Sequence, residues 1–217
     1  MQREALLYTK CMKDTIVFFD FDGVIADTFE SNMVINRLHS SDLSDDEYRA
    51  FFNGNVNTEI AKRKDRLMPT EQFFSHYERS LQDAVLFSGM DECLREISKQ
   101  HELIIVSSTI SPLIEAFLKR ANLHEHFLEI LGNDVHHSKV VKFKWALEKY
   151  NLTPSHALLI TDTLGDIREA DEVGLPSVAV AWGFHSPVTL ETGNPYVIVD
   201  KPQDILHYIN LYFNGIS

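Results

Sequence analysis

The stretch Thr15–Thr28, TIVFFDFDGVIADT, predicts both the fold and the place of the site. An apolar run suited to a buried strand ends in two aspartates, Asp20 and Asp22, and Gly23 follows them. Residues two apart on an extended chain point to the same side, so both carboxylates can face one site. Gly23 permits a sharp turn or a close approach of the backbone. Taken alone, these residues also suit an ordinary turn capped by aspartates.

The composition is that of a folded, acidic protein. The chain has 217 residues, of which 44% are hydrophobic, and this is enough for a packed core. The formal net charge of -12 repels phosphate backbones, which disfavours nucleic acid and anionic membranes as partners. An acidic protein that handles a small anion needs a local positive charge, such as a metal ion or a well-placed lysine.

Cysteine usage and the N-terminal residues favour a cytoplasmic protein. Cys11 and Cys93 lie far apart and suggest neither a disulfide framework nor a metal-binding spacing. Charges interrupt the first fifteen residues, so we expect no signal peptide, and no apolar run is long enough to cross a bilayer. The sequence is compatible with a monomer or a homodimer.

Continuous apolar runs alternate with helical patterns along most of the chain. None of the runs alternates apolar with polar residues, which is typical of parallel strands covered on both faces. This pattern predicts an α/β fold with a doubly wound, Rossmann-like parallel sheet. The predicted strands are Thr15–Phe19, Leu103–Val106, Ala157–Ile160, Ser177–Ala181 and Tyr196–Val199.

Capping residues place the helices between these strands. We expect Ser111 to cap a helix with Pro112 at its first position, and Ser138 to precede another helix. Gly174 is suited to end a third helix, and a fourth follows Pro202.

One part of the chain departs from the alternation. Residues 29–86 contain several helical patterns and no convincing strand, which is too much chain for a single crossover. We therefore predict a small α-helical domain at 29–86, inserted into a core made of residues 1–28 and 87–217.

Polar side chains follow three of the predicted strands. Ser107 comes after the second strand, and Asp162 and Asp166 come after the third, while Lys139 opens a helix between them. Because ligands bind beyond the carboxyl ends of strands in open α/β sheets, these groups are expected to meet Asp20 and Asp22. Oxygen ligands of this kind favour magnesium over zinc, and together they predict a site for a phosphoryl group.

Four segments resemble, in order, the motifs of the haloacid dehalogenase (HAD) superfamily of phosphatases. DFDGVIADT is similar to its first motif, DxDG(T/V)xxD(S/T), and LIIVSS to its second. SKVVKF resembles its third motif, and LLITDTLGDIREA its fourth, commonly GDTxxD, with Thr161 in place of the glycine. The resemblance spans about residues 15–199, and the insert lies where phosphoglycolate phosphatase-like and β-phosphoglucomutase-like members carry a helical cap.

The resemblance implies a mechanism. Asp20 would be the nucleophile that forms an aspartyl-phosphate, and Asp22 the general acid and base. Mg²⁺ would be held by Asp20, the backbone carbonyl of Asp22, and Asp162. Ser107 would bind a phosphoryl oxygen and Lys139 would neutralise its charge, while Gly23, Ser108 and Asp166 would support the phosphate and the metal. An acid/base aspartate at Asp22 favours phosphate esters as substrates.

Several nearby residues have simpler explanations than a role in the site. We expect Lys142 and Lys144 to be solvated helix lysines, and Asp27 to be at least as suited to a turn as to catalysis. The basic stretch Lys62–Arg66 could bind a second anion, but an exposed charged helix face is favoured. Histidine metal sites at His124/His126 and His136/His137 are disfavoured.

The insert is expected to select the substrate. In proteins that it resembles, a loop around a central glycine reaches the active site, and here Phe51–Glu59 is similar to that loop. Asn53, Gly54 and Asn55 are the candidate specificity residues, although asparagines around Gly54 also suit a plain turn.

The function expected from these observations is Mg²⁺-dependent hydrolysis of a small, soluble phosphorylated metabolite. A phosphomutase of the same fold is an alternative, but such enzymes carry a cap-loop arginine for the second phosphate, and Asn57 lies near that place. A binding or regulatory protein without turnover is a third possibility, against which the complete set of motif residues argues.

Overall fold

The computed structural model describes residues 13–63 and 65–215, and these contain one parallel sheet with the strand order β3-β2-β1-β4-β5-β6. The order turns between β1 and β4, and open α/β sheets bind ligands in the crevice at such a point. The strands are β1 (Ile16–Phe19), β2 (Glu102–Val106), β3 (Phe127–Leu131), β4 (Ala157–Thr161), β5 (Ser177–Val180) and β6 (Val197–Val199).

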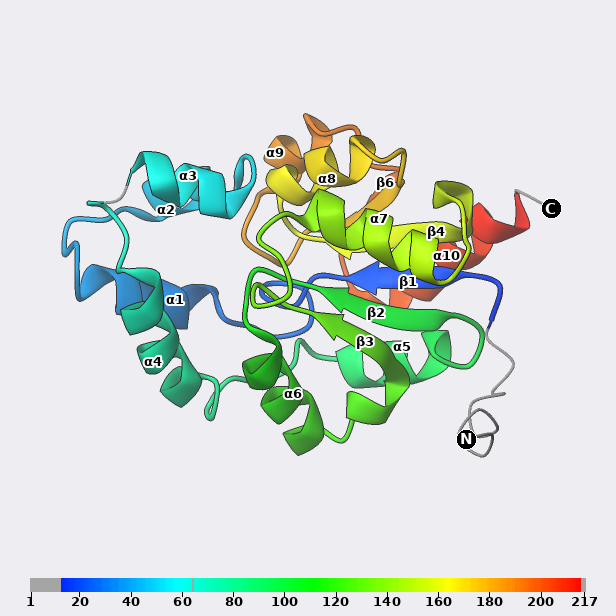
Figure 1. The fold of residues 1–217 in the computed structure, drawn as a ribbon, viewed down its shortest axis with the longest axis horizontal. Helices are drawn as coiled ribbons and strands as arrows, with labels where there is room; N and C mark the ends of the chain where they lie inside the picture. The colour runs from blue at the N-terminus through cyan, green and yellow to red at the C-terminus, as the bar shows by residue number, and fades with distance from the viewer. Residues whose placement is uncertain (1–12, 64, 216–217) are drawn as a thin grey trace, which may run out of the picture.

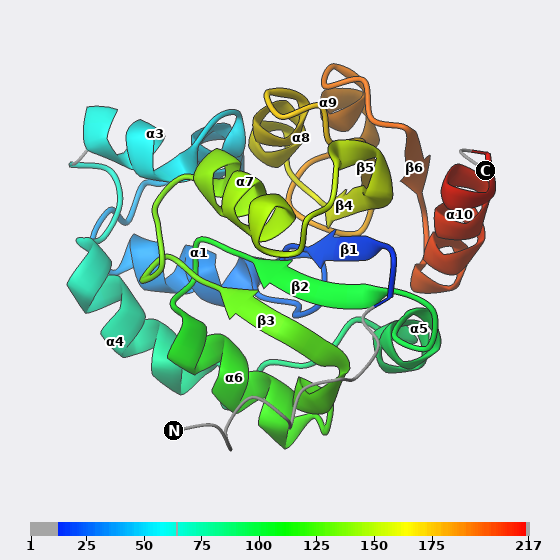
Figure 2. The ribbon, with the colours of Figure 1, turned by 45° about the vertical axis from the view of Figure 1, so that its right-hand side comes forward.

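Helices cover both faces of the sheet (Figures 1 and 2). One face packs against α5 (Met90–Ile97), α6 (Ser111–Arg120) and α10 (Pro202–Asn214). The other face packs against α7 (Lys139–Lys149), α8 (Leu164–Asp171) and α9 (Pro187–Glu191). These three layers confirm the predicted doubly wound α/β class.

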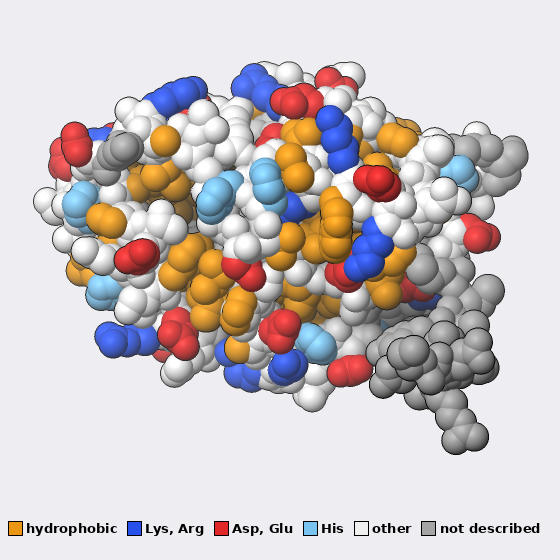
Figure 3. Space-filling view, viewed as in Figure 1, with side chains coloured by type: hydrophobic (Ala, Val, Ile, Leu, Met, Phe, Trp, Pro, Cys, Tyr) orange, Lys and Arg blue, Asp and Glu red, His pale blue; other side chains and the backbone are white. Residues whose placement is uncertain are grey.

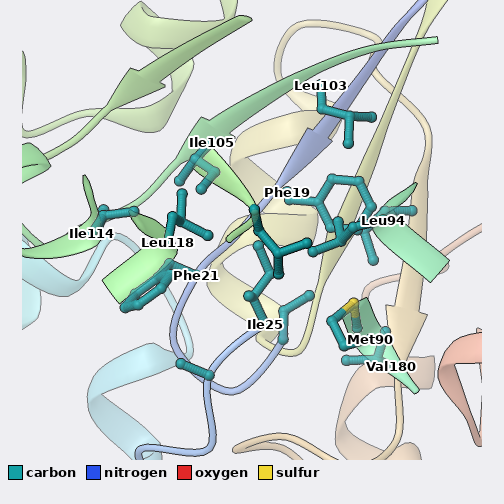
Figure 4. Close-up of a cluster of buried hydrophobic side chains, with 14 of the residues drawn as sticks. Phe19, Phe21, Ile25, Met90, Leu94, Leu103, Ile105, Ile114, Leu118 and Val180 are labelled. Atoms are coloured by element: carbon teal, nitrogen blue, oxygen red, sulfur yellow. The ribbon is translucent and has the colours of Figure 1, made fainter. Parts of the chain in front are cut away.

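The central strands are apolar because both of their faces are buried. Every residue of β1, β2, β4 and β5 is buried. In β1, Phe18 packs edge to face with Phe143 of α7, with 5.2 Å between ring centroids, whereas Phe19 belongs to the opposite cluster. Figure 4 shows Phe19 beside Leu94 of α5 and Ile105 beside Leu118 of α6.

The strand β3 was not predicted. It forms one edge of the sheet, where it pairs only with β2 among the described strands, and it is only partly buried. Glu129 therefore interrupts its apolar residues, so β3 lacks the continuous apolar run by which the other strands were recognised.

Two predicted helix ends are shifted. Ser111 is the first residue of α6 and not its N-cap, which is Ile110. The Ser111 backbone N–H donates instead to Asp134 Oδ1 at 2.7 Å. Helix α8 ends at Asp171, and Gly174 lies beyond it with a φ of +69°, in the left-handed conformation that favours glycine. The predicted starts of α7 after Ser138 and of α10 at Pro202 are confirmed.

Four α-helices lie between β1 and α5, beyond the carboxyl ends of the strands (Figure 1). They are α1 (Phe29–Arg37), α2 (Asp45–Arg49), α3 (Val56–Lys62) and α4 (Thr70–Ser80), with a 3-10 turn, η1 (Ala50–Phe52), after α2. The chain enters and leaves this segment along two adjacent stretches. The Asp27 N–H donates to the Val85 carbonyl at 3.0 Å, and the Phe87 N–H to the Ile25 carbonyl at 3.2 Å.

The described surface is mixed in character. Figure 3 shows hydrophobic side chains over β3 and α7 on one face, and the exposed apolar residues of these elements are Leu128, Val141 and Trp145. Exposed apolar side chains of this number are ordinary at protein surfaces. Within residues 13–63 and 65–215, no helix combines the length and apolarity needed to cross a membrane.

One buried histidine links the stability of the fold to pH. His101 precedes β2, its ring stacks on Phe213, and its Nδ1 lies 2.7 Å from Thr15 Oγ1. Its Nε2 is buried without a hydrogen-bond partner. Burial, aided by the positive charge of Lys13, lowers the pKa of His101 to about 4.

We therefore expect His101→Gln to reduce the acid sensitivity of the fold. Below the unfolded pKa of about 6.5 the unfolded chain binds a proton that the folded chain refuses, so the free energy of unfolding falls as pH falls toward 4. Between pH 7 and pH 5 the free energy of unfolding should fall by about 1 kcal/mol less in the variant than in the wild type, after allowance for solvent screening. Urea unfolding at both pH values measures this, and equal losses would contradict it.

Candidate active site

The parallel register brings the predicted site residues to one edge of the sheet. Phe19 of β1 pairs with Ile105 of β2 and with Ile160 of β4, so these three strands end level. Asp20, Ser107 and Asp162 follow directly, and all three are buried. Asp20, Asp22, Ser107, Ser108, Lys139 and Asp166 line one cavity of about 40 Å³.

A buried ammonium group joins two of the carboxylates. Lys139 Nζ lies 2.9 Å from Asp20 Oδ2 and 2.6 Å from Asp166 Oδ2. The Ser138 side chain caps α7 by accepting from the Val141 N–H, which makes Lys139 the first residue of that helix. Thr161, which departs from the glycine of the resembling motif, donates its hydroxyl to Asp166 Oδ2 at 2.8 Å.

Burial and like charges set the electrostatics of this cluster. Burial, with a smaller effect of Asp166 and Asp162, raises the pKa of Asp20 well above its ordinary value, although Lys139 opposes this. For Asp166 the balance is reversed: despite burial, Lys139 and the surrounding hydrogen bonds lower its pKa. Burial raises the pKa of Asp162 to about 7. The carboxylates thus outnumber the nearby ammonium, and the cluster favours an added cation.

Asp22 is held by hydroxyl groups from three parts of the chain. Its Oδ1 accepts from Thr28 Oγ1 at 2.8 Å and from the Tyr77 hydroxyl, and its Oδ2 accepts from Thr109 Oγ1 at 2.7 Å. Tyr77 is fully buried and belongs to α4 of the inserted helices. Burial and the charge of Asp22 raise the pKa of Tyr77, so its hydroxyl stays protonated and donates. Thr28 is the last residue of the first motif, whereas nothing in the sequence pointed to Tyr77 or Thr109.

Two glycines let the backbone close around Asp162. Gly23 has a φ of +73°, and a Cβ there would lie 2.0 Å from Asp162 Oδ2. A Cβ on Gly183 would lie 2.4 Å from the same atom, and the Phe184 N–H donates to it at 2.7 Å. The predicted close approach at Gly23 is therefore present, and its target is Asp162.

Lys142 corrects a prediction. Lys144 is exposed as expected, but Lys142 is buried and donates to the Ser107 carbonyl at 2.6 Å and the Gly132 carbonyl at 3.3 Å. Lys142 lies one turn after Lys139 and shares its inward face of α7, a position that charge alone does not reveal. Burial, and then the charge of Lys139, lower the pKa of Lys142 to about 7. The side chain thereby ties the segment after β2 to the end of β3.

The candidate loop at 53–55 packs against the core. Asn53 is exposed, and its carbonyl accepts from Arg168 at 2.7 Å. Gly54 lines the cavity of Asp20, and its carbonyl lies so close to Gly165 that a Cβ there would approach to 2.3 Å. Asn55 caps α3, as the turn interpretation anticipated, because its Oδ1 accepts from the Thr58 N–H at 3.1 Å.

Glu169, which was not predicted as a site residue, connects this loop to Lys139 at the start of α7. Its Oε1 accepts from Asn55 Nδ2 at 3.0 Å and from the Lys139 backbone N–H at 3.0 Å. Burial raises its pKa. Glu169 lies one helical turn after Asp166 on α8, which is the signal that could have identified it.

The remaining candidates lie outside the cavity of Asp20. In the basic stretch, Arg63 pairs with Glu59 and Arg66 pairs with Glu47, while Lys64 lies outside the described residues, as does Cys11. Asp27 is exposed. His137 Nδ1 lies 3.0 Å from Asn133 Oδ1, and His136 Nδ1 accepts from the Ser138 N–H.

The residues present fit a magnesium ion. Asp162 Oδ1 is buried and has no hydrogen-bond partner, so it is available as a ligand. Asp20 carries a second buried carboxylate, and Gly23 brings the adjoining backbone against Asp162. The described residues form no group of three or more Asp, Glu, His or Cys side chains around one point. Two carboxylates with a backbone carbonyl need no such group, since Mg²⁺ keeps several waters as ligands.

The parallel sheet with helices on both faces defines an α/β protein with a candidate site at the carboxyl edge of its strands. Comparisons with known proteins identify its family. Residues 17–180 match the family model described as haloacid dehalogenase-like hydrolase, which covers most of the described sheet. The chain belongs to the haloacid dehalogenase-like hydrolase family.

Two curated relatives match nearly the whole chain in sequence, and a solved structure matches its fold. A phosphoglycolate phosphatase from Synechococcus elongatus is 27% identical over 205 residues, covering 89% of this chain and 96% of that protein. A pyrophosphatase PpaX from Bacillus mycoides is 24% identical over 210 residues, covering 90% and 96%. A solved structure described as a predicted phosphatase from Clostridium acetobutylicum has the same fold, with a TM-score of 0.74 at 21% identity over 92% and 99% of the two chains.

Lys142 and Lys144 of α7 give a matched test of how the segment after β2 is held. Lys142→Met removes the Lys142 donor from the buried Ser107 carbonyl, whereas the Gly132 carbonyl keeps the Val135 N–H at 3.2 Å. We expect this loss to lower the free energy of unfolding by about 2 kcal/mol. Lys144→Met, on the exposed side of the same helix, should change it by less than about 0.5 kcal/mol. Urea unfolding at pH 8 measures both, and equal effects would show that Lys142 does not hold the segment after β2.

Proposed function

We propose that the protein is a Mg²⁺-dependent phosphatase that hydrolyses a small soluble phosphomonoester. One observation carries this proposal: Asp20, Asp22 and Lys139 line one cavity. Asp20 and Lys139 are buried and paired there, and Asp22 accepts hydrogen bonds from hydroxyl groups. The phosphatase and pyrophosphatase named among the relatives support the reaction class.

In the proposed reaction, an Asp20 carboxylate oxygen attacks phosphorus, and the bond from phosphorus to the ester oxygen breaks. Asp22 gives its proton to that leaving oxygen. Water then attacks the phosphorus of the aspartyl-phosphate, Asp22 takes the proton of this water, and the bond from phosphorus to Asp20 breaks. Thr28, Tyr77 and Thr109 hold the Asp22 carboxyl in one orientation for both proton transfers.

The other residues of the cavity have supporting roles in this proposal. Lys139 neutralises charge on the phosphoryl group, Ser107 donates a hydrogen bond to it, and the adjacent Ser108 supports its binding. Asp166 orients Lys139. Asp20, Asp162 and the Asp22 carbonyl would hold Mg²⁺, which would offset the repulsion between the nucleophile and the phosphate.

The inserted helices, residues 29–86, are proposed to act as a cap over the cavity of Asp20. Their two connections run side by side at residues 25–27 and 85–87, which is a short base for a hinge motion. In the described arrangement Tyr77 reaches Asp22 and Asn55 reaches Glu169, so the cap closes over the cavity and limits entry of water. Asn57, near the place of the mutase arginine, donates to Asn133 Oδ1 at 3.2 Å, and an amide there favours hydrolysis over phosphoryl return.

Substitution of the proposed nucleophile is the direct test. Asp20→Asn should lower kcat for p-nitrophenyl phosphate by at least about 1000-fold, and removal of Mg²⁺ with EDTA should have a similar effect. Phosphate release is measured, with Asp27→Asn, an exposed aspartate of the same segment, as the matched control. Unchanged release in Asp20→Asn would exclude this mechanism, and Mg²⁺ binding without any release would favour a binding protein.

Tyr77 provides a second test, of proton transfer by Asp22. Tyr77→Phe removes one donor to the carboxyl and should lower kcat/KM, which reports departure of the leaving group, by about 10-fold for an alkyl phosphate, because an alkoxide leaves only with a proton. The loss for p-nitrophenyl phosphate should be much smaller, since its leaving group needs no proton. Tyr208→Phe on distant α10 is the control. Equal losses on both esters would indicate a structural role for Tyr77.

A further inference from the structure

A second cavity adjoins the first on the side of the inserted helices. It has a volume of about 100 Å³, and its walls share Asp22, Phe52, Ser108 and Phe184 with the cavity of Asp20. An ester whose phosphoryl group lies at Asp20 would therefore extend its leaving group past Asp22 into this space. We refer to it as the leaving-group cavity.

The walls of the leaving-group cavity are mainly apolar. Aromatic and aliphatic side chains from the inserted helices and from the loop after β5 form most of its surface. They include Phe52, Ile60, Leu67, Phe73, Phe74 and Phe184. An apolar cavity of about 150 Å³ holds benzene, so about 100 Å³ suits a leaving group of roughly four to six non-hydrogen atoms.

Asp22 is the single charged side chain among the described residues that line this cavity. Two arginines of the inserted helices, Arg49 and Arg63, are engaged in other contacts. The Arg49 guanidinium stacks over Phe29 and donates to the Phe184 carbonyl, and that of Arg63 stacks over Phe51 and pairs with Glu59. A second anionic group on the substrate would thus be buried in this cavity without a cation beside it, which is strongly unfavourable.

One side chain that lines the cavity carries an oxygen without a partner. Asn32 of α1 is 5% exposed, and its Oδ1 is buried without a hydrogen bond, so a small rotation of the amide would present this oxygen to the cavity. Asn36, by contrast, uses both ends of its amide, since its Nδ2 donates to the Asn32 carbonyl and its Oδ1 accepts from the Met68 N–H. A buried acceptor without a donor is costly, and a ligand hydroxyl would satisfy it.

We propose, on the basis of the phosphatase function above, that the substrate is the phosphate ester of a neutral, largely apolar alcohol with one further hydroxyl that donates to Asn32. The compounds in the names of the two relatives differ from this class. Phosphoglycolate carries a carboxylate and pyrophosphate a second phosphate, so each presents an anionic leaving group.

The test compares three primary alkyl phosphates of equal reactivity. They are 4-hydroxybutyl phosphate, butyl phosphate and 4-phosphooxybutanoate, which differ only at the far end of the chain. We expect kcat/KM to be highest for the hydroxyl ester and at least about 100-fold lower for the carboxylate. Equal or better turnover of the carboxylate would overturn the proposal.

Two variants locate the effect in the leaving-group cavity. Asn32→Leu should reduce the advantage of 4-hydroxybutyl phosphate over butyl phosphate, which we expect to be about 10-fold, toward unity. Ile60→Arg introduces a cation and should raise kcat/KM for 4-phosphooxybutanoate relative to butyl phosphate by about 10-fold. Ile60→Gln, of similar length and without charge, should not. If neither ratio moves, the leaving group does not occupy this cavity.

Failure of the proposed function is distinguishable from failure of this inference. A folded protein that releases phosphate from none of the three esters nor from p-nitrophenyl phosphate lacks the proposed activity. Binding of the three esters, measured by calorimetry with Mg²⁺ present, then decides the inference. Tighter binding of the neutral esters than of the carboxylate supports it, and equal or reversed affinities overturn it.

Discussion

The site depends on one buried ammonium group. Lys139 lies between Asp20 and Asp166 in a region from which water is largely excluded, and without it two carboxylates would be buried close together with no compensating charge. Such a pair would have to take up protons or move apart. The capped start of α7 and the Glu169 side chain that accepts from the Lys139 N–H both fix the position of this lysine.

The inserted helices contribute a hydrogen bond to Asp22, the proposed general acid. Tyr77 from α4 donates to the same carboxyl oxygen of Asp22 as Thr28, while Thr109 from the core donates to the other oxygen. Asp22 therefore has its complete set of hydroxyl partners only when the inserted helices lie against the core. This arrangement couples closure of the proposed cap to the orientation of the proposed general acid.

Membership of the haloacid dehalogenase-like hydrolase family leaves the substrate undetermined, since the phosphoryl site and the leaving-group cavity are built from different segments. The phosphoryl site is built from strand ends of the parallel sheet and the start of α7. The leaving-group cavity is built mostly from helices between β1 and α5, and its walls are mainly apolar. No lysine or arginine is among the described residues that line it, so a second anion on the substrate would have no cation beside it. The named relatives, at 27% and 24% identity, differ from this chain in most side chains.

The sequence by itself determined the α/β class and the convergence of Asp20, Ser107, Lys139 and Asp162. These features follow from local patterns, namely continuous apolar runs and the polar residues that end them. It could not show β3, because an edge strand is half exposed and lacks a continuous run. It also placed Lys142 wrongly in solvent, because which face of α7 turns inward is decided by packing. Tyr77, Thr109 and Glu169 reach the site from segments far along the chain from their partners, whereas Thr28 lies six residues from Asp22. Only the tertiary structure sets these contacts, because hydrogen bonds between distant residues depend on how helices pack and not on the residues beside them.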